Sequence, residues 1–190
     1  MTTTLGSAWC RNARPIGPAL LLALSLGSGC GESPTAPSPS FHVEVTDPVG
    51  DAPVTQTAPN PPDLVHLRVD VQAGTATFAL RFAPGWDLFT TFLDVFLDID
   101  QNPATGVAGD GMGAEYDLGP GAVLKFVGTN TTVVGTPTFT LVSDGMNISV
   151  PLSLLGGDDG KMDVRVRAHH SAQAAFDSMP NVGLPPLHVQ

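Results

Sequence analysis

The sequence predicts an all-β protein whose folded part is a single β-sandwich of antiparallel sheets, of the immunoglobulin or jelly-roll kind. Apolar and polar residues alternate with a period of two after residue 40, as they do in half-buried strands. Of the 18 acidic residues, 15 are aspartate, which favours turns, and three are glutamate, which favours helices. Segments with a helical period are short and few, at 152–155 and 171–176. A closed barrel would give the same alternation, and the sequence leaves that alternative open.

The alternation is clearest in the first half of the chain. Segments 41–46, 64–71 and 75–82 each place apolar side chains on one face and polar side chains on the other. The pair Ala73-Gly74 separates the second and third segments by a short turn, so these two strands are predicted to form a hairpin.

A different pattern marks the centre of the predicted sandwich. Segment 92–99 is apolar on both faces except at Asp94 and Asp98, which predicts a central strand. A Gly/Asp-rich turn at 155–160 most simply joins its flanking strands as a hairpin loop. Further strands are predicted at 122–127, 131–134, 138–142, 147–152 and 162–168.

The N-terminus has the parts of a secretory signal. Arg11 and Arg14 precede an apolar run over 16–26, and small residues follow that run. The run is too short to cross a hydrocarbon layer of about 30 Å as a helix. Residues 1–29 are therefore predicted to be a signal peptide.

Cys30 follows these small residues directly and resembles the lipidated cysteine of bacterial lipoproteins. In that family a leucine usually stands three positions before the cysteine, whereas Leu26 stands one position earlier. The resemblance implies a lipid on Cys30 and, because Gly31 rather than Asp follows, an outer-membrane anchor with the domain outside the cytoplasm, facing the periplasm or the surface. The Pro/Ser-rich segment 30–40 predicts a flexible linker, and 41–190 the sandwich domain. An ordinary secreted protein cut nearby is the alternative.

The net charge excludes nucleic acid as a partner and suggests that the domain binds a cation. The net charge of −10 excludes a nucleic-acid binder that works through a basic face. Removal of the signal would leave six basic residues against the 18 acidic ones. Both cysteines precede residue 41, so no disulfide can hold the predicted domain together. Bound calcium would relieve the repulsion between its carboxylates.

The sharpest candidate for a metal site follows the predicted central strand. Oxygen-bearing side chains at alternate positions, Asp98, Asp100 and Asn102, stand where the strand becomes a loop. Asp110 and Glu115 lie just beyond and could complete the six to eight oxygen ligands that Ca²⁺ takes. The alternative is an Asx-rich turn whose side chains accept hydrogen bonds from main-chain N–H groups.

A second candidate lies near the start of the domain. Asp47 and Asp51 flank a Pro-Val-Gly turn, and Asp63 follows a proline-rich loop over 52–62. These three carboxylates could converge on a second ion. The alternative is that they serve only as turn residues and as the start of a strand.

These turn motifs resemble those of the DOMON-like and family 9 carbohydrate-binding-module domains. The resemblance rests on DPVGD (47–51), DLVHLRVDV (63–71), FLDIDQNPATG (96–106) with GAEYDL (113–118), VPLSLLGGDDG (150–160) and DSMPNVG (177–183). It implies a secreted β-sandwich, structural calcium with Asp177 as an additional ligand, and a carbohydrate or other cell-surface partner. It implies the fold and the calcium more strongly than sugar binding.

Three functions remain open: sugar binding, haem binding and glycan hydrolysis. Trp86, in a Pro-Gly-Trp-Asp loop, is the best candidate to stack on a sugar ring, although a tryptophan packed on the core is as consistent with the pattern. Haem is an alternative, through a His and Met pair drawn from His42, His66, His169, His170 and His188 and Met112, Met146, Met162 and Met179. A glycan hydrolase using Asp98 and Glu115 is a third. No nucleophile elbow, phosphate loop or zinc helix is present, so a non-enzymatic binding or structural module is the prediction.

Overall fold

The computed structural model describes residues 40–58, 60–109, 111–172 and 174–190. All of these residues belong to one compact unit. The predicted signal peptide, the cysteine predicted to be lipidated (Cys30), residues 31–39 of the predicted linker and the candidate ligand Asp110 lie outside the described residues. Within the part of the chain that is described, no helix has the length and hydropathy needed to cross a membrane.

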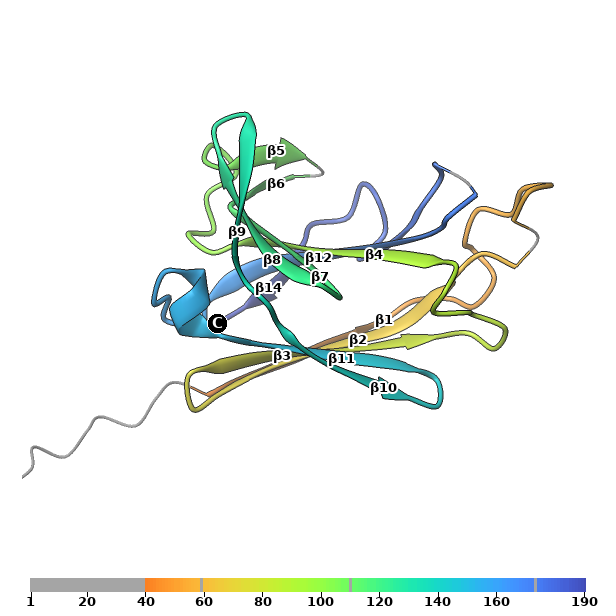
Figure 1. Cartoon of the computed structure of the whole chain (residues 1–190), viewed down its shortest axis with the longest axis horizontal. Coiled ribbons are helices and arrows are strands. Elements are labelled where there is room, and N and C mark those ends of the chain that lie inside the picture. Colours follow the sequence, from red (N-terminus) through yellow and green to blue (C-terminus); the bar gives the residue numbers. More distant parts are fainter. Residues whose placement is uncertain (1–39, 59, 110, 173) are drawn as a thin grey trace, which may run out of the picture. The chain divides into compact units, whose positions relative to one another are not determined.

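Two antiparallel sheets pack face to face, so the predicted sandwich is confirmed (Figure 1). Sheet A has the order β1 (Phe41–Thr46), β2 (Leu64–Gln72), β3 (Thr75–Phe82), β11 (Gly145–Pro151) and β10 (Thr138–Val142). Sheet B has the order β13 (Asp177–Met179), β12 (Met162–His170), β4 (Thr91–Asp98), β7 (Tyr116–Gly119), β8 (Ala122–Val127) and β9 (Asn130–Gly135), and β14 (Leu187–Val189) also pairs with β12. A separate hairpin of β5 (Val107–Gly109) and β6 (Met112–Ala114) lies beside sheet B on the side away from sheet A.

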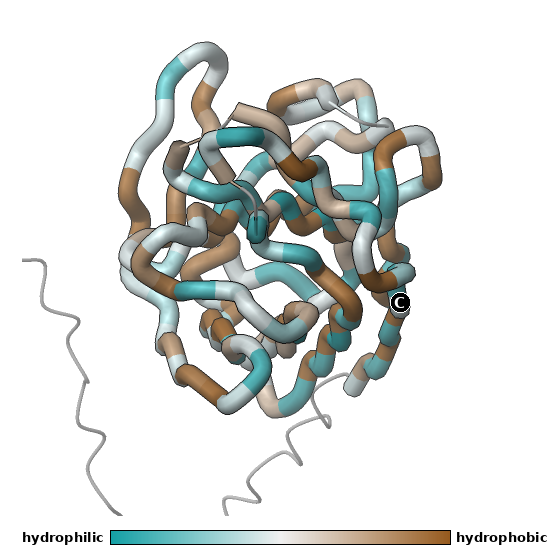
Figure 2. Tube along the Cα trace, turned by 90° about the vertical axis from the view of Figure 1, so that its right-hand side faces the viewer, coloured by the Kyte–Doolittle hydropathy of each residue, from teal (hydrophilic) through white to brown (hydrophobic). Residues whose placement is uncertain are grey.

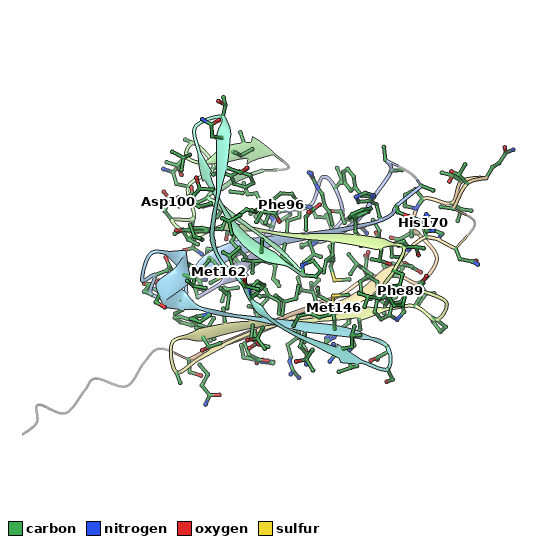
Figure 3. All side chains as sticks on the ribbon, viewed as in Figure 1. Phe89, Phe96, Asp100, Met146, Met162 and His170 are labelled. Carbon is green, nitrogen blue, oxygen red and sulfur yellow. The ribbon has the colours of Figure 1, made fainter. Side chains whose placement is uncertain are left out.

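The core lies between the two sheets and is filled by alternate residues of each strand. Figure 2 shows the resulting alternation of hydrophobic and hydrophilic residues along the chain. Met146 of sheet A and Met162 of sheet B are both fully buried between the sheets (Figure 3). Each large apolar side chain buried in this way stabilises the fold by about 1.5–3 kcal/mol. The core of a domain of this size can therefore hold it together without a disulfide.

All nine predicted strands are present, and the predicted hairpin joins β2 to β3. The central strand is confirmed, because β4 pairs with both β12 and β7. The short helical turn at Leu152–Leu155 is a 3₁₀ helix. Five short strands had no sequence prediction: β5, β6, β7, β13 and β14. Each spans only three or four residues, which is too short for a period of two to stand out.

Two predictions were wrong. Residues 171–172 and 174–176 form no helix: the Ser171 N–H is bonded to the Thr90 carbonyl, and this contact holds the segment against the loop before β4. The turn at 155–160 is not a hairpin loop, because β11 before it lies in sheet A and β12 after it lies in sheet B. Leu155 is buried and Gly156 has a left-handed conformation, so the chain turns here from one sheet to the other.

The β2–β3 turn carries a strained residue that can be tested. Ala73 and Gly74 have positive φ angles of 50° and 76°, as a type I′ turn requires. Because Ala is unfavourable in this region, Ala73→Asn should stabilise the fold by about 0.5–1 kcal/mol in urea denaturation. Gly74→Ala is the opposite control and should destabilise it. A loss of stability in Ala73→Asn would contradict the turn type.

Candidate metal centres

The first candidate centre forms where β4 ends. Asp98, Asp100 and Glu115 each place one carboxylate oxygen so that the three oxygens lie within 4.8 Å of one another. Asp98 is completely buried, Glu115 is half-buried and Asp100 is exposed. The structure therefore brings together three of the side chains that were predicted as metal ligands.

Strand pairing brings Glu115 to the end of β4. The Glu115 N–H donates to the Leu97 carbonyl at 2.9 Å, and Glu115 Oε2 accepts the Ile99 N–H at 3.0 Å. The carboxylate of Asp98 is held from two directions, since Oδ1 accepts the Asn102 N–H at 3.0 Å and Oδ2 accepts the Gly113 N–H at 2.9 Å. The loop over 99–106 thus curls around Asp98.

The hydroxyl of Thr105 is surrounded by more acceptors than it can satisfy. Thr105 Oγ1 lies 2.9 Å and 3.0 Å from the two oxygens of Asp100, 2.9 Å from the Asn102 carbonyl oxygen and 3.1 Å from Glu115 Oε1. A hydroxyl has one hydrogen to donate. In most of these contacts, therefore, two oxygen atoms face each other with no hydrogen between them. Such a group of oxygens is stabilised by a bound cation or by added protons.

The pKa values of the two less exposed carboxyls of this cluster, Asp98 and Glu115, are raised mainly by burial. Burial raises the pKa of Asp98, although the N–H groups of Gly113 and Asn102 oppose the shift, and neighbouring Asp100 adds to it. Burial likewise raises the pKa of Glu115, opposed by its bonds from Ile99 and Thr105. Both groups hold a proton more tightly than they would in water. A cation in the same place would remove the need for that proton.

Asn102 contributes to the first candidate centre mainly through its main chain. Its side-chain Oδ1 accepts the Ala104 N–H at 3.1 Å, which makes an Asx turn, while its carbonyl oxygen faces Thr105. Thr105 was not among the predicted ligands. Its place in the loop, five residues after Asp100 and directly before Gly106, is the only sequence signal that could have marked it.

Two glycines pack the loop against the β5–β6 hairpin. A Cβ atom on Gly113 would lie 2.1 Å from the Thr105 carbonyl oxygen, and one on Gly106 would lie 2.4 Å from the Ala114 carbonyl oxygen. Gly106 also has a φ of +60°, which favours glycine. Backbone therefore touches backbone here, and the position of the hairpin follows the position of the loop.

The second candidate centre joins residues that are far apart in the sequence. Asp47, Asp51 and Asp177 place carboxylate oxygens within 4.8 Å of one another. Asp177 is fixed from β2 and from its own strand, because Oδ2 accepts the Leu64 N–H at 2.6 Å and Oδ1 accepts the Ser178 N–H at 2.8 Å. The residue that the family resemblance implied as an additional ligand is thus a full member of this cluster.

Asp63 lies beside this cluster and has an unsatisfied oxygen. Its Oδ2 accepts the Gly50 N–H at 2.7 Å, so the side chain is tied to the loop between Asp47 and Asp51. Asp63 is only 8% exposed, and its Oδ1 has no hydrogen-bond partner. The buried Oδ2 of Asp47 also has no partner. Buried acceptors of this kind are rare and favour a cation or a water among them.

Burial is the main cause of raised pKa values in the second cluster too. It raises the pKa of Asp177 to about 6, with contributions from Asp51 and Asp47, and it raises the pKa values of Asp47 and Asp63. Asn181 Nδ2 opposes the shift at Asp47 by donating to Oδ1 at 2.8 Å. The carboxylates are close enough to repel one another, and the one amide relieves only part of the repulsion.

The other predicted ligand-contacting residues have local partners. Trp86 stacks on Phe82, with ring centroids 4.8 Å apart, and packs against the core. The four methionines of the haem alternative, Met112, Met146, Met162 and Met179, are all buried. Of the five histidines, three face carboxylates (His42, His66 and His188), His169 stacks on Phe92 and His170 accepts the Ala172 N–H.

Comparison of the chain with protein-family models, with curated proteins and with solved structures gave no match. The resemblance to DOMON-like and family 9 carbohydrate-binding-module domains therefore stays a prediction that rests on the turn motifs.

Proposed function

We propose that the protein is a non-enzymatic, extracytoplasmic binding or structural module whose sandwich is stabilised by calcium. The observation that carries the proposal is the arrangement around Thr105, where one hydroxyl faces four acceptor oxygens beside the buried carboxylate of Asp98. Either acidic cluster is able to hold a metal ion.

The donor atoms favour calcium over other metals. The first cluster offers carboxylate, hydroxyl and main-chain carbonyl oxygens from an irregular loop, and the second offers carboxylates. Zinc and copper favour nitrogen and sulfur ligands, and magnesium requires a nearly ideal octahedron. Calcium accepts six to eight oxygens in a flexible arrangement. Water would complete either site.

The proposed location rests on the lipoprotein-like cysteine. A lipid on Cys30 would tether the domain through the Pro/Ser-rich segment 30–40, and β1 begins at Phe41 immediately after it. The domain that such an anchor would carry is acidic and contains no cysteine. It would therefore depend on its core and on bound ions rather than on disulfides. A cell-surface polysaccharide is the partner that the family resemblance implies.

Calcium binding should raise thermal stability. At a free calcium concentration about 100 times Kd, a site gains roughly 2.7 kcal/mol, which corresponds to a rise in Tm of roughly 5–10 °C. Asp100→Asn and Asp51→Asn should each lower the bound calcium from two ions to one, because each removes a ligand from one cluster. Both side chains are exposed, so the fold should persist.

Asp144→Asn is the matched control, since Asp144 lies in a different turn with its side chain 62% exposed. This variant should keep both ions and the full rise in Tm. The measurements are differential scanning calorimetry with and without a chelator, and calcium stoichiometry by isothermal titration calorimetry. No change in Tm on chelation, or two ions still bound to Asp100→Asn, would contradict the proposal.

The stabilisation by calcium should depend on pH. The raised pKa values of Asp98, Glu115, Asp47, Asp63 and Asp177 mean that the metal-free folded state binds more protons than the unfolded state between about pH 4 and pH 6. Stability of the metal-free protein therefore falls as pH rises through this window. Calcium must displace these protons at low pH, so it should raise Tm more at about pH 7.5 than at about pH 5. An equal or larger rise at the lower pH would argue against ion binding at the carboxylates.

The lipid anchor can be tested separately from the metal. In the full chain, Cys30→Ser should move the protein from the membrane fraction to the soluble extracytoplasmic fraction, because the acylated thiol is lost. Cys10→Ser changes a cysteine within the predicted signal and should leave the protein with the membrane. Membrane association of Cys30→Ser in cell fractionation would contradict the anchor.

A further inference from the structure

A groove of about 250 Å³ opens at the end of the sandwich where β1 and β3 finish. One wall comes from the β1–β2 loop, and the other comes from residues 83–85, which directly follow β3. Figure 1 shows the β1–β2 loop and the β3–β4 loop at this same end of the sheets. The Ala83 N–H donates to the Asp63 carbonyl at 2.8 Å, so the two walls are joined at their base.

Most of the groove's lining is apolar. Val49 and Val54 of the β1–β2 loop are 72% and 68% exposed, so they form its rim. The rest of the apolar lining consists of small and cyclic side chains, from Ala52, Pro61, Ala83 and Pro84. A cavity of about 150 Å³ with an apolar lining holds benzene, so this groove has room for an aliphatic chain of about four or five carbons.

One carboxylate lies in this lining, and its hydrogen bonding is incomplete. Asp63 is only 8% exposed. Its Oδ2 accepts the Gly50 N–H at 2.7 Å, whereas its buried Oδ1 has no hydrogen-bond partner among the described residues. A buried carboxylate with an unpaired oxygen costs free energy unless a donor or a cation lies beside it. Because Asp63 also lines the groove, a cation bound in the groove would lie next to this carboxylate.

The charge of the groove is negative and is not compensated from within its lining. In the part of the chain that the structure describes, no basic side chain lines the groove. Asp51 repels the Asp63 carboxylate, and Asp63 in turn repels that of Asp47. Pro59, the one residue of the β1–β2 loop outside the described part, carries no charge, and residues 30–39, 110 and 173 include no basic residue either. A cation from solution is therefore the partner that this groove favours.

Calcium in the second cluster would not remove this negative charge. The three carboxylates that converge there, those of Asp47, Asp51 and Asp177, do not include Asp63. Together with Asp63 they carry four negative charges, and one Ca²⁺ supplies two positive charges. An ammonium group in the groove therefore meets net negative charge whether or not calcium is bound.

We propose that this groove binds a small aliphatic primary amine in its protonated form, with the ammonium beside Asp63 and the alkyl chain between Val54 and Pro84. An ammonium group has three N–H donors to offer to the carboxylate. An inorganic cation would leave the apolar walls without a partner, and an uncharged apolar molecule would leave the carboxylate without one. The inference goes beyond the proposed calcium binding and does not rest on it.

Pentylamine is the probe, with 1-pentanol and pentanoate as neutral and anionic controls of nearly the same size. In isothermal titration calorimetry of the full chain at about pH 7.5, pentylamine should bind with a Kd on the order of 1 mM or tighter. The two controls should bind at least about tenfold more weakly, because they lose the charge-assisted hydrogen bond. From ethylamine to pentylamine, each added methylene should strengthen binding about two- to fourfold as it is buried between the walls.

Asp63→Asn tests the charged part of the groove. This variant removes the negative charge and keeps an oxygen for the Gly50 N–H, and it should weaken pentylamine binding at least about tenfold. Asp158→Asn is the matched control, because Asp158 also accepts the N–H of a turn glycine, that of Gly160 at 2.7 Å, and does not line the groove. It should bind pentylamine like the unchanged protein.

Val54→Lys tests the groove without changing a buried residue. Val54 is exposed at the rim, so the fold should persist even if Asp63→Asn fails to fold. The added ammonium should repel the probe and compete with it for Asp63, which weakens pentylamine binding at least about tenfold. Val133→Lys adds the same charge at a residue of β9 that is 64% exposed, and it should keep the full affinity.

The outcomes separate this inference from the calcium proposal. Pentylamine should bind the chelated protein, and calcium should weaken that binding by no more than about threefold. If calcium abolishes the binding, Asp63 belongs to the calcium site and the inference is overturned. It is also overturned if 1-pentanol binds as tightly as pentylamine, or if Val54→Lys leaves the affinity unchanged. If calcium leaves Tm unchanged while pentylamine binds, the proposed function fails and this inference stands.

A last comparison distinguishes a free amine from a lysine side chain of a partner protein. Nα-acetyl-lysine methylamide carries the same ammonium on a four-carbon chain that ends in two amide groups. It should bind at least about threefold more weakly than pentylamine, because its amide groups lose water at the apolar rim. Tighter binding than that of pentylamine would overturn the assignment to a free amine in favour of a lysine side chain.

Discussion

The buried carboxylate of Asp98 is the constraint on which one end of the molecule depends. Its two oxygens accept N–H groups from Asn102 in the loop after β4 and from Gly113 in β6, so a single side chain fixes the loop, the hairpin and the entry into β7. A fully buried charge is costly unless it is compensated, and two N–H groups compensate only part of one carboxylate. Glu115 and Asp100 then add negative charge to the same place. The loop geometry that satisfies Asp98 is therefore also a geometry that could hold a cation.

The sequence predicts the parts of this fold that are decided locally. The period of two identifies strands because each strand buries one face, and this requirement applies whichever strand is its neighbour. Which sheet the chain enters after a turn is decided by packing between residues that are far apart in the sequence. The turn at 155–160 therefore looks like a hairpin loop, although it carries the chain between sheets, and the three-residue strands β13 and β14 depend on pairing with β12.

The same distinction applies to the candidate site. Asp98, Asp100 and Glu115 were predictable because they follow one strand and begin the next, and antiparallel pairing brings those positions together. In the second cluster, Asp177 takes the place that was predicted for Asp63. Asp177 reaches the cluster through β13, a strand that no local sequence pattern predicts. The importance of Thr105 could not be inferred either, because it comes from four surrounding oxygens whose positions are set by the fold.

The two clusters lie at opposite ends of the β4–β12 pair. Asp98 ends β4, whereas Asp177 pairs with Ala168, which faces Leu93 near the start of β4. Five residues of strand separate the two ends, or about 17 Å. Each end joins segments that are remote in sequence, and no cysteine after residue 30 is available to connect them. Ions at both ends would restrict the chain as disulfides do in other proteins, and would also neutralise the carboxylates that make the domain acidic. Under the proposed calcium binding, the surplus of aspartate would help to hold this sandwich together.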